Sequence, residues 1–502
     1  MTTRVWSRLG AALAHVPLIA AACFVLLYVV LAVMRMGYPF ELEWMEGGSL
    51  GQVSWIVSGH KLYGPPSLEF TPWVYPPLYF YLAAAVSSVL EGGFFPLRLL
   101  SFVCSLGSIA LIFAMVRRET GSARAAALSG GLFAATYQLG GAWFDLARSD
   151  SLFLVLLLAA FYVLRWGGSF PAAVTAGVLL ALSFFSKQTA LVAALPIALY
   201  CTFVDWRRGL SFAVTAAVVI AGGTLILDRW QDGWFSYYVF VLPGRLSSRV
   251  IPERVVYFWT RDVGMPLVVA FTLGVFHAVK TATQPSRGRW FCFALALGLL
   301  VSAWIPRIQS GGFQNTAIPA YAAVSLLFGL GLEGLRRTLA PIEELPGTQL
   351  RVLLELLCAM QFAVLVYNPL TVLPRRGDLA AGHRVVQRLA QVDGDVLAFS
   401  QSYLAVMAGK PPTAHAAAIL DVLGWGSEQQ RSTLAREVRE ALAAGRFKAV
   451  VADGRNDSVF GGTLDNYDDA GLLFDDPRAF WPVTGYRVRP ERLYILREPT
   501  RR

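Results

Sequence analysis

Eleven long apolar segments constrain this chain to a membrane-embedded helical bundle more strongly than any other feature. A helix needs about 20 mainly apolar residues to cross the hydrocarbon core of a bilayer. The candidate segments are Val16–Met34, Phe95–Val116, Ala123–Leu139, Ser151–Trp166, Ala172–Phe185, Thr189–Val204, Leu210–Leu227, Met265–Val279, Trp290–Trp304, Ala317–Leu332 and Val352–Tyr367. Composition agrees, because 56% of the residues are hydrophobic and only 15% are charged, whereas soluble domains carry about a quarter charged residues. The predicted fold class is therefore an all-α polytopic membrane bundle with about eleven transmembrane helices.

The segment Tyr75–Leu90 is apolar but short, and Pro76 and Pro77 stand at its start. If it does not cross and the N-terminus is cytoplasmic, eleven Lys and Arg residues fall in the short inside loops and three in the short outside loops. Inside loops are normally the more basic ones, and a crossing here would invert every loop. We therefore predict a re-entrant or surface-lying helix, an uncleaved N-terminal anchor and an external C-terminus, in an integral inner or plasma membrane protein.

Charge and ligand patterns exclude several other classes. The net charge of +10 lies almost entirely among the apolar segments, since residues 376–502 carry 17 basic and 16 acidic residues. This distribution suits loops that fix membrane topology and argues against a nucleic-acid partner. The five cysteines are isolated in apolar stretches and the five histidines are scattered. We expect neither disulfides nor a zinc site.

Residues 376–502 are predicted to form a separate extracytoplasmic α/β domain that follows a membrane domain over residues 1–375. Strands are expected at Val396–Ser400, Phe447–Ala452 and Tyr494–Leu496, and a helix at Glu428–Ala444. No motif in this region identifies a reaction. An accessory or acceptor-binding role is a hypothesis only.

Glu41, Glu43 and Glu46 form an acidic cluster directly after the first apolar segment. Ionisable groups at membrane depth usually mark a functional site, although a solvated loop at the membrane boundary is the plain alternative. Glu43 and Glu46 are three residues apart, so a helix would place both on one face. Gly47 and Gly48 follow and would let a ligand approach closely.

Several other polar residues are predicted to share the outer face with the glutamates. Asp150 begins an apolar segment, where it could cap a helix, orient the base or hold a cation. Lys187 could reach the membrane interface for solvation or bind a lipid-linked phosphate. Arg245 and Arg249 lie in a long loop rich in aromatic residues. Such a loop suits an amphipathic surface helix or a polyprenyl-phosphate site.

The order of these motifs resembles the GT-C superfamily of integral-membrane glycosyltransferases, near the protein-mannosyltransferase and aminoarabinose-transferase-like branch, also described as glycosyltransferase family 39-like. The similarity covers roughly residues 16–370. The motifs that carry it are the acidic cluster, Tyr75-Pro-Pro77, Leu97-Arg-Leu-Leu100, Arg117-Arg118, Ala147-Arg-Ser-Asp150, Lys187-Gln188 and Gly311-Gly-Phe-Gln-Asn315.

This resemblance implies a polyprenyl-phosphate sugar donor, a glycan, lipid or protein acceptor on the outer face, and an acidic residue of the first loop as general base. Members often carry Asp where this chain has only Glu; Glu46 matches best and Glu43 is the second choice, with Asp150 as a further catalytic candidate. The candidates for donor phosphate or lipid binding are Lys187, Gln188, Arg98, Arg148, Arg245, Arg249 and Tyr75. No metal ligands are assigned, and a divalent cation stays open.

A carboxylate would remove the proton of the attacking hydroxyl, and fixed cations would stabilise the leaving phosphate. Direct displacement would invert the anomeric configuration. A transporter or flippase of lipid-linked sugars is the rival class, but it should place polar groups at mid-membrane and show internal repeats, which this sequence lacks. A surface-polysaccharide polymerase or ligase is a further alternative. The sequence identifies neither the sugar nor the acceptor.

Overall fold

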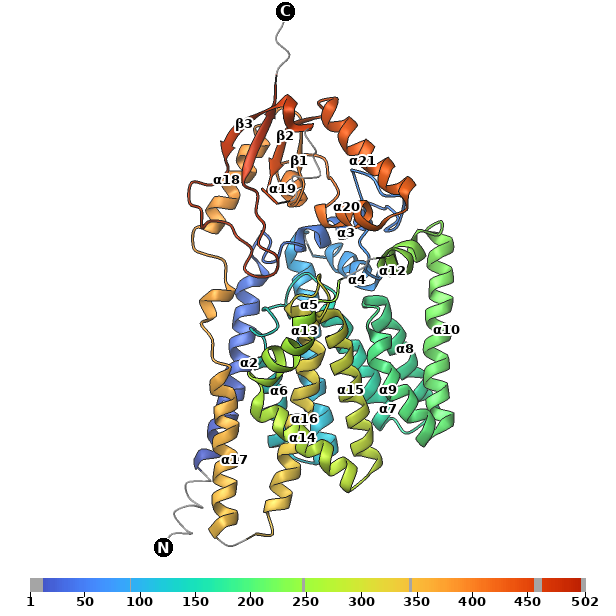
Figure 1. The fold of residues 1–502 in the computed structure, drawn as a ribbon, viewed down its shortest axis with the longest axis vertical. Helices are drawn as coiled ribbons and strands as arrows, with labels where there is room; N and C mark the ends of the chain where they lie inside the picture. Colours follow the sequence, from blue (N-terminus) through green and yellow to red (C-terminus); the bar gives the residue numbers. More distant parts are fainter. Residues whose placement is uncertain (1–11, 91, 246–248, 343–344, 456–462, 498–502) are drawn as a thin grey trace, which may run out of the picture.

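The computed structural model describes residues 12–90, 92–245, 249–342, 345–455 and 463–497. A bundle of long helices forms one end of the molecule, and a small sheet with its own helices forms the other (Figure 1). We refer to the segment Asp378–Leu496, from helix α18 to strand β4, as the C-terminal region. The first described helix lies in the bundle, whereas the last described strand lies in the sheet (Figure 1).

The bundle and its connections are helical almost throughout. The elements are α2 (His15–Met36), α3 (Glu46–Val57), α4 (Leu78–Ser87), α5 (Phe94–Thr120), α6 (Ala123–Ala135), α7 (Asp150–Trp166), α8 (Phe170–Ser186), α9 (Ala190–Val204), α10 (Trp206–Trp230), α11 (Trp234–Ser236), η1 (Tyr237–Val241), α12 (Leu242–Arg245), α13 (Pro252–Tyr257), η2 (Phe258–Gly264), α14 (Val268–Thr283), α15 (Arg287–Arg307), η3 (Gln314–Ala317), α16 (Ile318–Leu339), α17 (Leu345–Val364) and η4 (Pro369–Val372). Each of the eleven predicted apolar segments coincides with one of these helices.

Six helices in the described part of the chain are long and apolar enough to cross a membrane: α2, α5, α10, α15, α16 with η3, and α17. The segment Pro252–Gly264 and α14 would make a seventh span, bent by 100°. The predicted segments at α6, α7, α8 and α9 form helices of 13 to 17 residues, shorter than a simple span requires. The count of eleven crossings therefore stays a prediction.

The Tyr75–Leu90 segment forms only the ten-residue helix α4. A helix of this length rises about 15 Å, half the thickness of the hydrocarbon core. It lies beside α3 at the end of the bundle nearest the C-terminal region (Figure 1). Its length and position fit the surface-lying or re-entrant helix expected from the sequence.

A sharp turn joins α5 to α6. α5 ends at Thr120, and the next residue, Gly121, has a φ of 74° in the left-handed region that glycine adopts without strain. The next residue, Ser122, caps α6 by accepting a hydrogen bond from the Ala125 amide. This short connection packs α6 against both α5 and α2 and fixes the polar loop that follows α6.

The C-terminal region contains the four strands β1 (Asp395–Ala398), β2 (Phe447–Ala452), β3 (Tyr467–Leu472) and β4 (Arg492–Leu496). Their order is β1-β2-β4-β3, with β1 parallel to β2 and the other neighbours antiparallel. The helices are α18 (Asp378–Ala390), α19 (Ser402–Met407), α20 (Ala416–Trp425) and α21 (Glu428–Ala443), beside the short η6 (Thr463–Asn466). The three predicted strands and the predicted helix are confirmed.

The C-terminal region sits directly on the loop that follows α2. The Val483 amide donates a hydrogen bond of 2.8 Å to the Leu42 carbonyl, and the His415 ring contacts the Trp44 carbonyl at 3.1 Å. Burial lowers the pKa of His415 to about 4, so this imidazole is neutral. Its Nδ1 accepts from the Ala417 amide, hence Nε2 carries the proton and donates it to Trp44. The acidic loop therefore lies between the bundle and the C-terminal region.

Candidate active site

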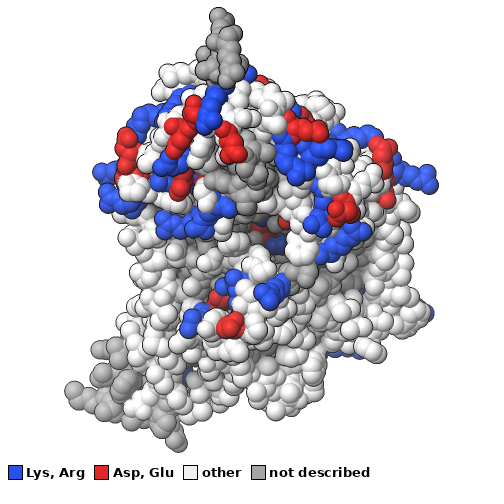
Figure 2. Space-filling model, turned by 45° about the horizontal axis from the view of Figure 1, so that its top comes forward, with Lys and Arg blue, Asp and Glu red and all other residues white. Residues whose placement is uncertain are grey.

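The three glutamates of the acidic cluster lie where the bundle meets the C-terminal region. α2 ends at Met36, and an irregular loop leads to Glu46, the first residue of α3. The surface of the molecule is hollowed beneath the C-terminal region, and basic and acidic side chains gather around the hollow (Figure 2). The acidic cluster is therefore positioned at a junction rather than on an open membrane-facing loop.

Glu46 is fully buried, and each of its oxygens accepts two hydrogen bonds. Arg98 donates from Nε at 3.0 Å and from Nη2 at 2.7 Å. The backbone amides of Leu42 and Ala147 add two bonds of 2.7 Å. Burial alone would raise the pKa of Glu46, but Arg98 and these hydrogen bonds outweigh burial and lower it. Glu46 is thus a permanently charged residue that ties α3 to α5 and to the loop before α7.

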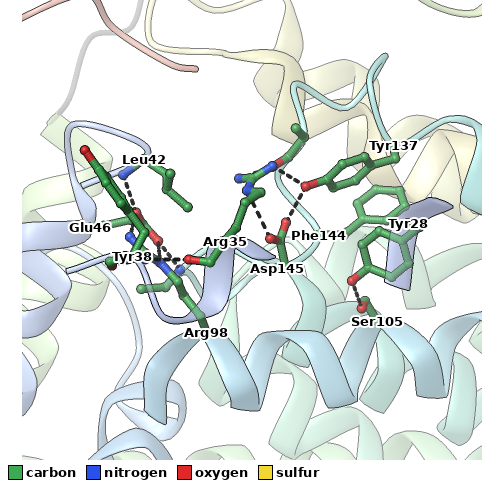
Figure 3. A network of polar contacts seen from close by, with 12 residues as sticks. Tyr28, Arg35, Tyr38, Leu42, Glu46, Arg98, Ser105, Tyr137, Phe144 and Asp145 are labelled. Atoms are coloured by element: carbon green, nitrogen blue, oxygen red, sulfur yellow. Dashed lines mark hydrogen bonds and ion pairs between the residues drawn. The ribbon is translucent and has the colours of Figure 1, made fainter. Parts of the chain in front are cut away.

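Arg98 extends this network to the end of α2, as Figure 3 shows. Its Nη1 donates to the carbonyls of Arg35 and Tyr38 at 3.1 and 2.6 Å, and its Nη2 donates to the Phe40 carbonyl at 2.7 Å. Arg98 is fully buried, so its donors are engaged by the protein itself. The sequence predicts Arg98 as a phosphate ligand, and the structure directs its donors to Glu46 and three backbone carbonyls.

A second buried ion pair continues the same network. Arg35 lies 3.2 Å from Asp145, and both side chains are almost completely buried. Tyr137 donates its hydroxyl to Asp145 at 2.7 Å, and Arg35 donates to the Ala142 carbonyl at 3.0 Å. The network joins α2, α3 and α5 to the loop between α6 and α7 (Figure 3). It holds the polar end of the bundle in one arrangement.

Glu43 is also fully buried, yet its environment is the opposite of that of Glu46. Within the described residues, neither of its carboxylate oxygens makes a hydrogen bond of normal geometry. The nearest cation is Nη1 of Arg148, at 3.7 Å from Oε2. Burial raises the pKa of Glu43 to about 8, against the opposing effects of Arg148 and the Met45 amide. Glu43 is therefore a carboxyl group with free acceptor positions and a pKa near neutrality.

Arg148 connects Glu43 to an aromatic wall. Its Nη2 donates to the Tyr75 hydroxyl at 3.1 Å, and its guanidinium carbon lies 5.3 Å from the ring centres of both Trp73 and Tyr75. Its Nη1 makes no hydrogen bond to any described residue. The Arg148 guanidinium and the Glu43 carboxylate are therefore neighbouring buried groups that both keep unused hydrogen-bonding capacity.

Asp150 and Lys187 form a second polar pair in the site. Asp150 is the first residue of α7 and accepts from Lys187 Nζ at 2.5 Å and from Asn315 Nδ2 at 3.1 Å. Lys187 follows the last residue of α8, and its ammonium has three donors, of which Asp150 takes one. Asn315 belongs to η3. Four segments far apart in the chain thus meet around Glu43 and Asp150.

Gln188 fixes the neighbouring backbone rather than another side chain of the site. Its Nε2 donates to the Val74 carbonyl at 2.9 Å and to the Val239 carbonyl at 3.3 Å. An apolar groove of about 720 Å³ begins beside it, between α8, α9 and α10. Leu191, one turn after Gln188, and Phe240, adjacent to Val239, both line this groove.

Arg245 and Arg249 are not drawn into this cluster. Both side chains are exposed, on either side of residues 246–248, which fall outside the described residues. Arg245 lies near Tyr237. Burial raises the pKa of Tyr237, and the charge of Arg245 partly opposes this rise. Their predicted role at the donor phosphate stays a prediction.

The described residues contain no group of three or more His, Cys, Asp or Glu side chains that could hold a metal ion. Glu41, the remaining acidic residue, is half-buried and accepts from the Gly47 amide at 2.9 Å. Its own amide donates to the Tyr403 hydroxyl of the C-terminal region at 3.3 Å. Its contacts are those of a loop-fixing residue.

The C-terminal region contributes residues that sequence reasoning did not assign to the site. Thr484 pairs with Glu43 in an isolated parallel bridge. A Cβ added at Gly485 would lie 2.8 Å from Glu43 Oε1, so glycine is required for this close approach. The sequence signal for these contacts is the Val483-Thr-Gly485 turn, which gives no indication of its partner.

The bundle contributes one further ion pair that the sequence did not predict, between Asp262 and Arg307 at 2.7 Å.

Residues 74–227 match the family model of dolichyl-phosphate-mannose-protein mannosyltransferases. This segment includes Tyr75, Arg98, Arg148, Asp150 and Lys187 and begins after the acidic cluster. No curated protein sequence matches the chain.

Solved structures extend the similarity to almost the whole chain. ArnT from Cupriavidus metallidurans bound to undecaprenyl phosphate is similar with a TM-score of 0.60 at 14% identity, over 94% of this chain and 97% of that chain. AglB, the oligosaccharyltransferase of Archaeoglobus fulgidus, in complex with an inhibitory peptide and a dolichol-phosphate, is similar with a TM-score of 0.53 at 13% identity, over 91% of this chain and 72% of that chain. At such identities, the likeness establishes a shared fold.

Proposed function

Because this chain has the GT-C fold of integral-membrane glycosyltransferases, with the mannosyltransferase match over residues 74–227, we propose that it transfers a sugar from a polyprenyl-phosphate donor to an acceptor hydroxyl. The observation that carries this proposal is Glu43, a buried carboxyl group that makes no hydrogen bond of normal geometry to the described residues and has a pKa raised to about 8. Such a group suits a general base, which works best with a pKa near the operating pH.

We assign Glu43, and not Glu46, as the base. All four acceptor positions of Glu46 are occupied by Arg98 and two backbone amides, so an acceptor hydroxyl has no free oxygen to approach. Glu43 retains its free acceptor positions. The acceptor hydroxyl donates its proton to Glu43 while its oxygen attacks the anomeric carbon.

The leaving group is the lipid phosphate, which takes the electron pair of the broken sugar–oxygen bond. Its developing charge requires fixed cations. Lys187 has two donors besides the one on Asp150, and Arg148 Nη1 has no hydrogen-bond partner in the described structure. We assign the phosphate to these two cations. Attack and departure on opposite sides of one carbon invert its configuration.

The apolar groove between α8, α9 and α10 offers a place for the polyprenyl chain. It begins next to Lys187 and Gln188 and is lined almost entirely by aliphatic and aromatic residues. α10, which forms its outer wall, buries only 11% of its most apolar stretch inside the protein. A lipid could therefore enter from the bilayer with its phosphate at the site and its tail in the groove. Undecaprenyl phosphate and dolichol-phosphate in the two similar structures support a donor of this class.

We further propose eleven membrane crossings, an outer-face site, a catalytic membrane domain over residues 1–375 and an extracytoplasmic domain over residues 376–502. The C-terminal region lies at one end of the bundle (Figure 1), and Glu43 contacts it through the bridge to Thr484, as a site built from outer loops requires. A cysteine at Ser286 should resist a membrane-impermeant thiol reagent in intact cells. A cysteine at Ser458, which lies outside the described residues, should react. The reverse labelling would contradict this orientation.

The catalytic proposal is tested with purified protein in nanodiscs, by mass spectrometry of polyprenyl phosphate released from a panel of lipid-linked sugars. Glu43→Gln should lower turnover by about 10³-fold while donor binding survives, because the amide cannot accept a proton. Glu41→Gln is the matched control and should retain most activity. Full activity of Glu43→Gln would overturn the assignment of the base. In closed proteoliposomes, movement of lipid-linked sugar across the bilayer without its turnover would favour the transporter class.

A further inference from the structure

A polar cavity of about 730 Å³ lies between the bundle and the C-terminal region. One wall is the connection that includes η4, and the other is the loop over residues 477–487. Ligand sites for small molecules typically measure roughly 300 to 1,000 Å³, so the cavity has room for a saccharide of one to three units. The polar side chains of its lining include Gln314, Asn368, Thr371, Arg375, Arg478 and Arg487.

The lining of the cavity connects to the candidate active site at two places, one at Glu43 and one at Asp150. Thr484 and Gly485 line it, and the same two residues contact Glu43 through the isolated bridge and the close approach at Gly485. Gln314 lines it as well and precedes Asn315, which donates to Asp150 at 3.1 Å. Glu43 itself is not part of the lining, and the turn at Thr484 and Gly485 lies between the cavity and this carboxyl group.

The lining carries an excess of positive charge. Arg375, Arg478 and Arg487 face one acidic residue, Asp378. Both oxygens of Asp378 accept backbone amides, from Arg375 at 2.9 Å and from Phe480 at 2.8 Å, so this carboxylate is used to shape the loop. Arg478 also pairs with Asp476 at 3.3 Å. For Arg375 and Arg487, no ion pair occurs within the described residues.

Trp481 fixes part of this wall. Its indole nitrogen donates to the Pro477 carbonyl at 2.9 Å, and Arg487 stacks on its ring at 4.8 Å from the ring centre. A guanidinium held in this way keeps its in-plane donors available. It can bind a phosphate or carboxylate through two parallel hydrogen bonds.

We propose that this cavity is the acceptor site and that the acceptor is an anionic saccharide, one that carries a phosphate or carboxylate group near the hydroxyl that is glycosylated. Arg375 and Arg487 bind the anionic group, the neutral polar side chains bind hydroxyls, and the reacting hydroxyl points to Glu43. The assignment of the cavity as an acceptor site rests on the proposed glycosyltransferase function. The C-terminal region thereby becomes part of the substrate site.

The test measures binding rather than turnover, with protein in nanodiscs and isothermal calorimetry. The probes are trehalose 6-phosphate and trehalose, which differ only in the phosphate. We expect the phosphorylated sugar to bind at least tenfold more tightly, and more weakly as salt concentration rises. Equal affinities for the two sugars, or no binding of the phosphate, would overturn the inference. A 6′-acylated form in the nanodisc bilayer distinguishes the source: tighter binding than the soluble form indicates a glycolipid headgroup, and equal binding indicates a free saccharide.

The double variant Arg375→Gln/Arg487→Gln should lose this preference at least tenfold, with an unchanged thermal unfolding midpoint because both side chains are exposed. The matched control is Arg384→Gln/Arg439→Gln, which removes two exposed arginines of the same region outside the cavity. Retained preference in the cavity variant, or equal loss in the control, would overturn the inference. Glu43→Gln should bind the probe normally. Failure of donor turnover with probe binding intact would therefore reject the proposed function and leave the anion site standing.

Discussion

Glu43 and Glu46 are three residues apart and equally buried, yet they belong to two different kinds of environment. Around Glu46, a bidentate arginine and two backbone amides satisfy every acceptor position. Around Glu43, the nearest cation stands at 3.7 Å and neither oxygen makes a hydrogen bond of normal geometry in the described structure. A satisfied buried charge holds a fold together, whereas an unsatisfied one costs stability and is retained for chemistry. The comparison teaches that burial alone does not identify a base.

The same contrast separates the two arginines of the site. Arg98 donates to Glu46 and to three carbonyls, whereas Arg148 has an unused Nη1 and stacks on two aromatic rings. The two environments are adjacent, because Glu46 accepts from Ala147, the residue before Arg148. The rigid network can therefore hold the reactive pair in place without taking part in the reaction.

The largest expected effect tests the structural half of the comparison. Arg98→Met leaves the Glu46 carboxylate buried without a cation and should destabilise the protein by about 3–5 kcal/mol. Thermal unfolding in detergent would measure this loss, with Arg384→Met as a surface control. Adding Glu46→Leu to Arg98→Met should recover part of the stability, because it removes the stranded charge. A stable, active Arg98→Met protein would show that the Glu46 network is dispensable and break the comparison.

A smaller effect is expected in the reactive half. Lys187→Met keeps the length of the side chain and removes its charge, and loss of one cationic contact to a developing oxyanion costs about 100-fold in rate. Some stability should also be lost, because Asp150 is left buried with its hydrogen bond from Asn315 and no cation, so rates are compared on folded protein. Turnover of purified donor lipid measures the change, and Lys187→Arg should retain more activity than Lys187→Met. An unchanged rate in Lys187→Met would indicate that this lysine serves solvation at the interface.

The fold could be predicted well from the sequence because its signals are local. Apolar segments mark the bundle helices, and runs such as Phe447–Ala452 mark strands whatever they pair with. The number of membrane crossings was harder to predict from the sequence, since α6 to α9 are too short to be assigned as spans by their length. The charges of the loops still led to one shared end for Glu43, Asp150 and Lys187.

The roles within the site could not be predicted, because they depend on pairings between distant segments. Glu46 was ranked first for the glycines that follow it, but its position against Arg98 gives it a structural role. Gly47 and Gly48 do not open a ligand path; an added Cβ at either would meet the rings of Tyr403 and Trp73, respectively. Nothing local in the sequence indicates that Gly485 packs on Glu43. These contacts arise only when the C-terminal region is seated on the bundle.

The smallest predicted effect distinguishes the two glutamates by pH. A general base works in its deprotonated form, and burial raises the pKa of Glu43 to about 8, so kcat/KM should rise with pH and level off above about pH 8. One unit below that pKa, about a tenth of the enzyme carries the active carboxylate, which predicts roughly tenfold lower kcat/KM at pH 7 than on the plateau. If Glu46 were the base, its lowered pKa would give a flat profile through the neutral and alkaline range. The measurement uses a neutral, non-titrating acceptor, and Glu41→Gln as a control should keep the wild-type profile. A flat profile would return the base to Glu46 or to another group with a low pKa, whereas a rise centred near pH 8 would assign the reaction to the unsatisfied carboxyl group.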